Sequence, residues 1–155
     1  ISFNYRHMIP QEVLELMPGR VINLHTSYLP YNRGSSPNFF SFLEDTPKGV
    51  TIHLMSAGLD EGDILCQREL HFDEEKETFA STYEALLQEI EKLFRENWQQ
   101  IREGSIIPVK QAGPVTYHRM KDLDAIREKV DFDWNMKIGD FKRAYEKAMR
   151  KDENS

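Results

Sequence analysis

The sequence predicts an α/β fold with a mainly parallel sheet flanked by helices. Two observations predict it: short apolar or alternating segments are separated by segments with helical spacing, and glycine and proline residues fall between them. The 155 residues are enough for one domain with a sizeable core. Contents of 39% hydrophobic and 30% charged residues are ordinary for a globular protein.

The first elements are separated by clear turn residues. Residues 1–4 are predicted to form a strand that leads into a turn. Pro10 can open a helix over residues 10–17, because a first-turn proline lacks only an amide hydrogen that the helix does not use. Pro18 and Gly19 end that helix, and a strand over residues 20–25 follows before a long loop to Pro37.

The middle of the chain predicts a short helix and two strands. Residues 38–43 carry apolar side chains at helical spacing, and residues 46–49 have the composition of a turn. Residues 50–55 alternate as a strand does, and residues 64–72 predict another. The loop between these two strands carries Asp60.

The clearest helix spans residues 78–102. Its apolar residues recur at spacings of three and four and give one broad face that we expect to pack in the core. They are Tyr83, Leu86, Leu87, Ile90, Leu93, Phe94, Trp98 and Ile101. Ser81 with Glu84 is a candidate capping pair, although the helix can already start at Thr78. Gly104 is expected to end it.

Beyond Gly104 the periodicity weakens. Loops with a short strand are predicted as far as residue 119, and charged helices over residues 121–130 and 138–149. Residues 150–155 are expected to be frayed or disordered.

Charge and cysteine content narrow the class of protein. The net charge is −6 and no block of Lys and Arg is large enough to follow a phosphate backbone, which argues against a broad nucleic-acid surface. The longest apolar runs are too short to span a bilayer, so no membrane association is expected. The single cysteine, Cys66, excludes an internal disulfide and fits a cytoplasmic location.

A polar pair ends the strand over residues 20–25. Asn23 and His25 are two residues apart and therefore share one face of the strand. Taken singly, Asn23 is typical of a strand end, His25 of a structural histidine and Asp60 of a turn. An amide donor beside an imidazole, however, suits a reaction that builds negative charge on a carbonyl oxygen. No second His or carboxylate lies at a ligand-like spacing, so no metal site is predicted. For His53 we favour packing over a supporting role near the site.

Five motifs in a fixed order resemble those of the folate-dependent formyltransferases. They are Asn23-x-His25, Ser27-Tyr28-Leu29-Pro30, Arg33-Gly34, Gly49-Val50-Thr51 and Gly58-Leu59-Asp60-x-Gly62-Asp63-Ile64. The resemblance implies a Rossmann-like formyltransferase fold and an enzyme that transfers a formyl group to a primary amine. It also implies that Asn23, His25 and Asp60 are the catalytic residues, with Asp63 as a rival for Asp60.

The same resemblance implies 10-formyltetrahydrofolate as the formyl donor, with no metal. The positions matching the family's folate-binding segments are Tyr5, Arg6, His7, Met8, Ile9, Gly58 and Leu59. The positions expected on the acceptor side are Ser27, Arg33 and Gly34.

The sequence that follows the long helix narrows the class of amine acceptor. About fifty residues follow the long helix, which leaves no room for the C-terminal β-barrel of methionyl-tRNA formyltransferases. The stretch around Tyr117 instead resembles small sugar formyltransferases, so a nucleotide-linked amino sugar is the leading acceptor and methionyl-tRNA the alternative. The sequence also allows a noncatalytic folate-binding or interaction module instead of an enzyme. It allows a homo-oligomer as well.

The start of the chain also departs from the family pattern. The chain begins with Ile1, whereas relatives carry βα units before this point. We therefore expect residues 1–104 to be the C-terminal portion of an N-terminally truncated catalytic domain. Residues 105–155 are expected to be a loop and helical extension of the same domain.

Overall fold

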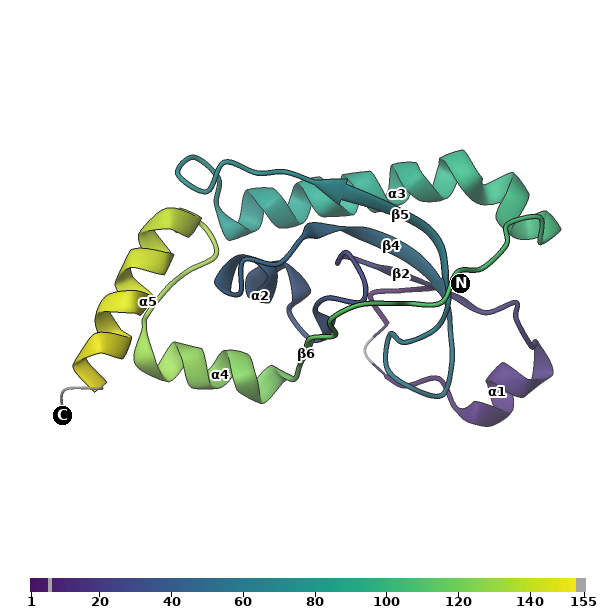
Figure 1. Ribbon diagram of the computed structural model, residues 1–155, viewed down its shortest axis with the longest axis horizontal. Coiled ribbons are helices and arrows are strands. Elements are labelled where there is room, and N and C mark those ends of the chain that lie inside the picture. The colour runs from purple at the N-terminus through teal and green to yellow at the C-terminus, as the bar shows by residue number, and fades with distance from the viewer. Residues whose placement is uncertain (6, 153–155) are drawn as a thin grey trace.

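The computed structural model describes residues 1–5 and 7–152, and Figure 1 shows the arrangement of their helices and strands. The elements in chain order are β1 (Ser2–Phe3), α1 (Gln11–Leu16), β2 (Ile22–His25), β3 (Arg33–Gly34), α2 (Pro37–Leu43), β4 (Lys48–Leu54), β5 (Ile64–Leu70), α3 (Phe79–Glu103), β6 (Tyr117–His118), α4 (Met120–Lys129) and α5 (Ile138–Asp152). The α/β class is confirmed, and the expected elements are present with ends shifted by a few residues.

The larger sheet has the strand order β1-β2-β4-β5. β1 pairs with β2 in parallel, whereas β2 with β4 and β4 with β5 pair antiparallel. Parallel pairing is therefore the minority in the described part of this sheet, contrary to the expectation. For β4 and β5 the physical reason is their short connection, because parallel neighbours need a crossover of a dozen or more residues.

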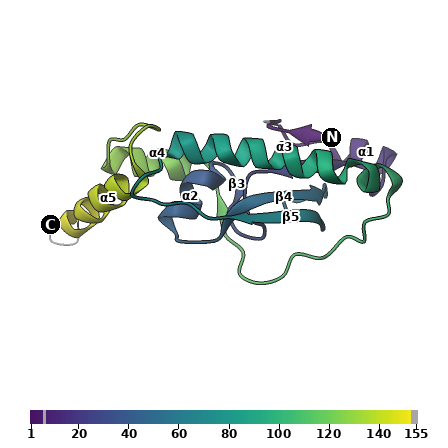
Figure 2. The ribbon, with the colours of Figure 1, turned by 90° about the horizontal axis from the view of Figure 1, so that it is seen from above.

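Helix α3 covers one face of the sheet, along which it runs in Figures 1 and 2. Its buried residues Leu86, Ile90 and Leu93 pack in one cluster with apolar residues of β2 and β4. The cap at its start differs from the expected pair of Ser81 and Glu84. Thr78 accepts a hydrogen bond from the Ser81 amide, and the Ser81 hydroxyl accepts one from the Thr78 amide. Gly104, with φ of 69°, ends the helix as predicted.

A second core joins α2 to the end of the chain. Phe39 and Phe42 of α2, Phe79 of α3 and Phe141 of α5 are all buried in one cluster, with ring centroids about 5 to 6 Å apart. Residues of α4 and α5 therefore pack in the same cluster as α2. The expectation that the chain frays from Arg150 is wrong for residues 150–152, which continue α5. Residues 153–155 lie outside the described part.

The segment between α3 and α4 returns to the middle of the molecule. Figure 2 shows it as a long green connection running beside the sheet. Ile64 and Val109 form an antiparallel bridge, and β3 pairs with β6 in parallel. This return brings residues near 110 against the loop that carries Asp60. In the described part of the chain, no helix combines the length and apolar character that crossing a membrane requires.

Candidate active site

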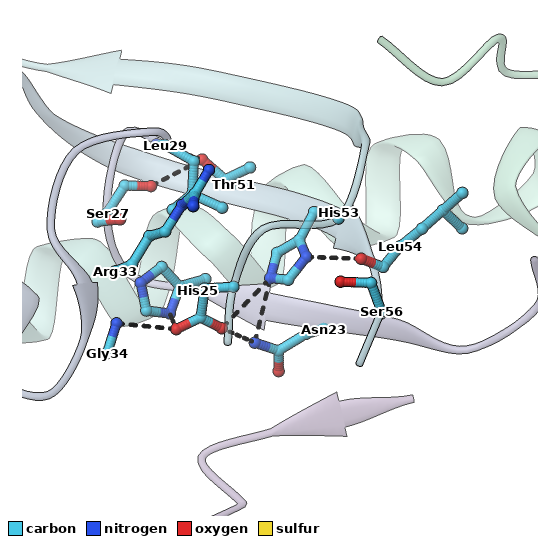
Figure 3. A network of polar contacts seen from close by, with 12 residues as sticks. Asn23, His25, Ser27, Leu29, Arg33, Gly34, Thr51, His53, Leu54 and Ser56 are labelled. Carbon is cyan, nitrogen blue, oxygen red and sulfur yellow. Dashed lines mark hydrogen bonds and ion pairs between the residues drawn. The ribbon is translucent and has the colours of Figure 1, made fainter. Parts of the chain in front are cut away.

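Figure 3 shows Asn23 and His25 on β2, and the third residue singled out for chemistry, Asp60, contacts both of them. Asn23 and His25 project from one face of β2, and Asp60 reaches them from the loop between β4 and β5. Asn23 Nδ2 donates to Asp60 Oδ1 at 3.2 Å, and His25 Nδ1 lies 3.7 Å from Asp60 Oδ2. The side chains of His25 and Asp60 are each only 10% exposed, so these contacts are largely shielded from water.

His53 is a fourth member of the cluster. It lies directly opposite Asn23 in the pairing of β4 with β2, and Asn23 Nδ2 is 3.3 Å from its Nε2 atom. Its Nδ1 atom is 2.8 Å from the Leu54 carbonyl oxygen, which can only accept, so Nδ1 carries a proton. In the neutral ring, Nε2 can therefore accept from Asn23; the same atom lies 3.5 Å from Asp60 Oδ1. Packing alone, the favoured interpretation from the sequence, understates this residue, and the cross-strand register was the signal that could have found it.

Asp60 is held in an unusual backbone conformation and as a carboxylate. Its φ of 52° lies in the left-handed region, which Asp tolerates better than most residues. Gly34 N–H donates to Oδ2 at 3.0 Å. Burial alone would raise the pKa of Asp60. When protonated, the His53 and His25 rings, together with the Gly34 amide, outweigh that effect and hold the pKa of Asp60 well below its ordinary range.

His25 is held mainly in its neutral form. Its Nε2 atom lies 3.2 Å from the carbonyl oxygen of Asn32, so the ring proton belongs on Nε2. Nδ1 then presents a lone pair toward Asp60. Burial lowers the pKa of His25, although the charge of Asp60 opposes the shift. A proton bound at Nδ1 would lie between an imidazole and a carboxylate, which suits transient proton holding.

The loop after β2 keeps these side chains in place. Asn32 is fully buried with φ of 56°, and its Nδ2 atom donates to Thr46 Oγ1 at 2.7 Å. Ser27 is 2% exposed and its hydroxyl donates to the Tyr31 carbonyl oxygen at 2.9 Å. This contact gives Ser27 a structural part in the loop.

An open groove of about 530 Å³ lies beside Asp60, within the size range of small-molecule sites. Its lining includes residues from the end of β4, from the Asp60 loop and from two further segments: Met55, Ser56, Glu61, Gly62, Arg33 and Gln111. A Cβ at Gly62 would lie 1.7 Å from the Leu54 carbonyl oxygen, so only glycine lets the loop pass so close to β4.

The residues expected to bind folate lie in two places. Gly58 and Leu59 directly precede Asp60, and Leu59 is 37% exposed. Tyr5 and Met8 are more than half exposed, and Tyr5 contacts His7 edge to face at 5.6 Å. They follow the carboxyl end of β1, where Phe3 pairs with Leu24 of β2. Arg6 lies outside the described residues, and Ile9 is partly buried.

Arg33 and Gly34 both lie at the site. The Gly34 amide binds Asp60, and the Arg33 side chain binds Gln111, which the sequence did not single out. Across residues 1–5 and 7–152, no group of three or more His, Cys, Asp or Glu side chains is placed to hold a metal ion.

Comparisons with known proteins agree on one family. The family model described as formyl transferase matches residues 1–97. The chain is 44% identical to the formyltransferase PseJ from Anoxybacillus kamchatkensis, solved in complex with UDP-4,6-dideoxy-4-formamido-L-AltNAc and tetrahydrofolate. That match has a TM-score of 0.85 and covers 90% of this chain and 74% of the other.

Two further relatives differ in acceptor. The dTDP-4-amino-4,6-dideoxyglucose formyltransferase of Mycobacterium bovis is 32% identical over 82% of this chain and 53% of its own length. A methionyl-tRNA formyltransferase from Thermodesulfovibrio yellowstonii is 35% identical over 73% of this chain and 37% of its own length. The chain thus spans about half the length, or less, of these two relatives.

Proposed function

Because the chain belongs to the formyl transferase family, we propose that it transfers a formyl group from 10-formyltetrahydrofolate to a primary amine. Asn23, His25 and Asp60 are the proposed catalytic residues. The observation that carries this proposal is their convergence, with Asp60 within 3.2 Å of the amide and 3.7 Å of the imidazole, beside a groove of small-molecule size.

The proton chemistry follows from the two low pKa values. When an amine attacks the formyl carbon, a new C–N bond forms, charge collects on oxygen, and the amine must lose a proton. Asp60 is a weak base because its pKa lies well below the ordinary range. We therefore assign the proton to His25 Nδ1, where Asp60 stabilises the imidazolium that results. That proton can then pass to the carrier nitrogen as the C–N bond to the carrier breaks.

Asn23 is proposed to donate to the developing oxyanion. Both N–H groups of its side chain are engaged, one with Asp60 at 3.2 Å and one with His53 at 3.3 Å. The contact with the His53 ring nitrogen is the weaker of the two, because a hydrogen bond to a carboxylate is charge-assisted, so the formyl oxygen would replace the contact with His53. Loss of such a donor typically costs about 10² to 10³ in rate.

The groove fits the donor by size and by lining. The end of β4 offers backbone groups at Met55 and Ser56, which can bind the edge of a flat heterocycle. Leu59, Tyr5 and Met8 present exposed apolar surface that can pack on its face. These residues, with His7, Ile9, Gly58 and Arg6, are the proposed donor-binding set, and Arg33 and Gly34 are proposed on the acceptor side.

A nucleotide-linked amino sugar is the proposed acceptor. The 44% identity to PseJ, solved with a nucleotide-linked formamido sugar, favours it over methionyl-tRNA, whose formyltransferase is 35% identical. The net charge of −6 also offers no broad surface for tRNA.

Turnover with a panel of acceptors tests the proposal. The chain is incubated with 10-formyltetrahydrofolate and a UDP- or dTDP-linked 4-amino sugar or methionyl-tRNA, and release of tetrahydrofolate and the acceptor mass are measured. Formylation of an amino sugar that is abolished by His25→Ala, but kept by the exposed control His71→Ala, supports it. Formylation of methionyl-tRNA alone would show that methionyl-tRNA, and not an amino sugar, is the acceptor. Folate binding without turnover of any amine would identify a noncatalytic module instead.

A further inference from the structure

Gln111 lies in the segment that returns from α3. Both the nitrogen and the oxygen of its side-chain amide form hydrogen bonds. Nε2 donates to the carbonyl oxygens of Asp60 and Gly62, both at 2.8 Å. Oε1 accepts from Arg33 Nη2 at 2.8 Å and from Arg33 Nε at 3.2 Å. A primary amide has two N–H donors and one oxygen with two lone pairs, so its hydrogen-bonding capacity is filled.

These bonds join the two segments that hold the Asp60 carboxylate. The first is the loop that carries Asp60, which Gln111 binds through two backbone carbonyls. The second is β3, where Arg33 binds Gln111 and the adjacent Gly34 donates its amide to Asp60 Oδ2. Gln111 thus fixes the backbone on both sides of the carboxylate and makes no contact with the carboxylate itself.

The Asp60 loop needs such a restraint. Asp60 has a left-handed backbone, which L-residues other than glycine adopt at a cost. Few other side chains brace the preceding turn in the described structure, where Ser56 Oγ reaches the Gly58 carbonyl oxygen only at 3.4 Å. The two bonds from Gln111 hold the peptide group between residues 60 and 61 and that between residues 62 and 63 at fixed positions.

We propose that Gln111 is a positioning residue that sets the distance between Asp60 and His25 by clamping the Asp60 loop to β3. This inference rests on the proposed formyl transfer. The residue type is specific, because glutamate at this position would turn acceptor oxygens toward the Asp60 and Gly62 carbonyls. Methionine would keep the length of the side chain and lose every bond.

The test compares Gln111→Glu and Gln111→Met with Gln99→Glu, which adds the same charge on the exposed face of α3. Both Gln111 variants are expected to lower kcat up to about a hundredfold, the effect of misplacing a catalytic group by about 1 Å. KM for 10-formyltetrahydrofolate is expected to change less than about threefold, because the groove lining at Met55 and Ser56 stays. Gln99→Glu should match the unaltered chain in both constants.

A second readout does not depend on turnover. The Gly34 amide proton reports its bond to Asp60 Oδ2 in a ¹H–¹⁵N NMR spectrum, and either Gln111 variant should move it upfield while most other amides stay. If the unaltered chain shows no turnover, the proposed function fails and the NMR comparison still tests the clamp. The proposal that Gln111 positions Asp60 would be overturned if both variants kept the kcat of the unaltered chain, or if both kept its Gly34 amide shift. The methionine variant carries the test if the glutamate variant does not fold.

Discussion

Two buried regions of this molecule are held together in different ways. The polar cluster of Asn23, His25, His53 and Asp60 depends on directed contacts of 3.2 to 3.7 Å between groups that would otherwise be hydrated. The aromatic cluster around Phe79 and Phe141 depends on contact area between rings. The directed contacts determine the chemistry of the site, because a small displacement of one side chain changes the protonation of its neighbours. The ring contacts determine stability, because removal of one ring leaves a cavity in the core.

Substitutions in the two regions should therefore have separable effects on activity and on stability. Changes in the polar cluster are expected to affect turnover more than folding, and changes in the aromatic cluster the reverse. Helix α3 links the two regions indirectly. It contributes Phe79 to the aromatic cluster, and it contributes Leu86 and Ile90 to the apolar core of the sheet that carries Asn23 and His25.

The largest expected effect is the loss of turnover in Asp60→Asn. The amide keeps the shape of the carboxylate but cannot stabilise a proton on His25, so kcat should fall by about 10² to 10⁴, the usual contribution of a proton-transfer group. The midpoint of urea unfolding should also fall, because the low pKa of Asp60 means that its charge stabilises the fold, and the single amide oxygen can accept from Gly34 or from Asn23 but not from both. The variant should nevertheless stay folded in the absence of urea. An equal loss of kcat and of folded protein would contradict the proposed separation.

Phe79→Ala is the matched change in the aromatic cluster. Phe79 is 1% exposed and contacts the rings of Phe39 and Phe141, so its removal should lower the free energy of unfolding by about 3 to 5 kcal/mol. Activity per folded molecule should stay near the unaltered value. Tyr83→Ala on the same helix is the control, because Tyr83 is 38% exposed and should cost less than about 1 kcal/mol.

The same contrast explains what the sequence could predict. The apolar spacing of residues 78–102 predicted α3 because a helix is encoded locally. Asn23 and His25 were placed on one face by the strand period, and Asp60 was found by its motif. His53 and Gln111 were not assigned to the site, because their positions depend on the register of β4 against β2 and on the return of a long loop. No local pattern encodes either of these, nor the antiparallel pairing of β4.

Acid should weaken the polar cluster through His25. Burial lowers its pKa in the folded protein below the ordinary value of 6.5, so the unfolded chain binds the proton more readily. This contribution to stability is therefore present above about pH 6.5 and is lost as the pH falls below it, with a slope of at most about 1.4 kcal/mol per pH unit. Asp60 stays ionised in this range. Urea unfolding between pH 5 and 7.5 should show a shallower slope for His25→Gln, and equal slopes would contradict the assignment.

The smallest expected effect lies at the start of α3, which supports both regions. Thr78 and Ser81 exchange hydrogen bonds at 3.0 and 2.9 Å, so Thr78→Ala should lower the free energy of unfolding by about 1 kcal/mol. Since the Phe79 ring stays in place, the loss should be far smaller than that of Phe79→Ala. Activity per folded molecule should not change, because the cap makes no contact with Asp60 or His25. Urea unfolding and kcat measured on one preparation test this, and a fall in kcat would mean that α3 couples the two regions.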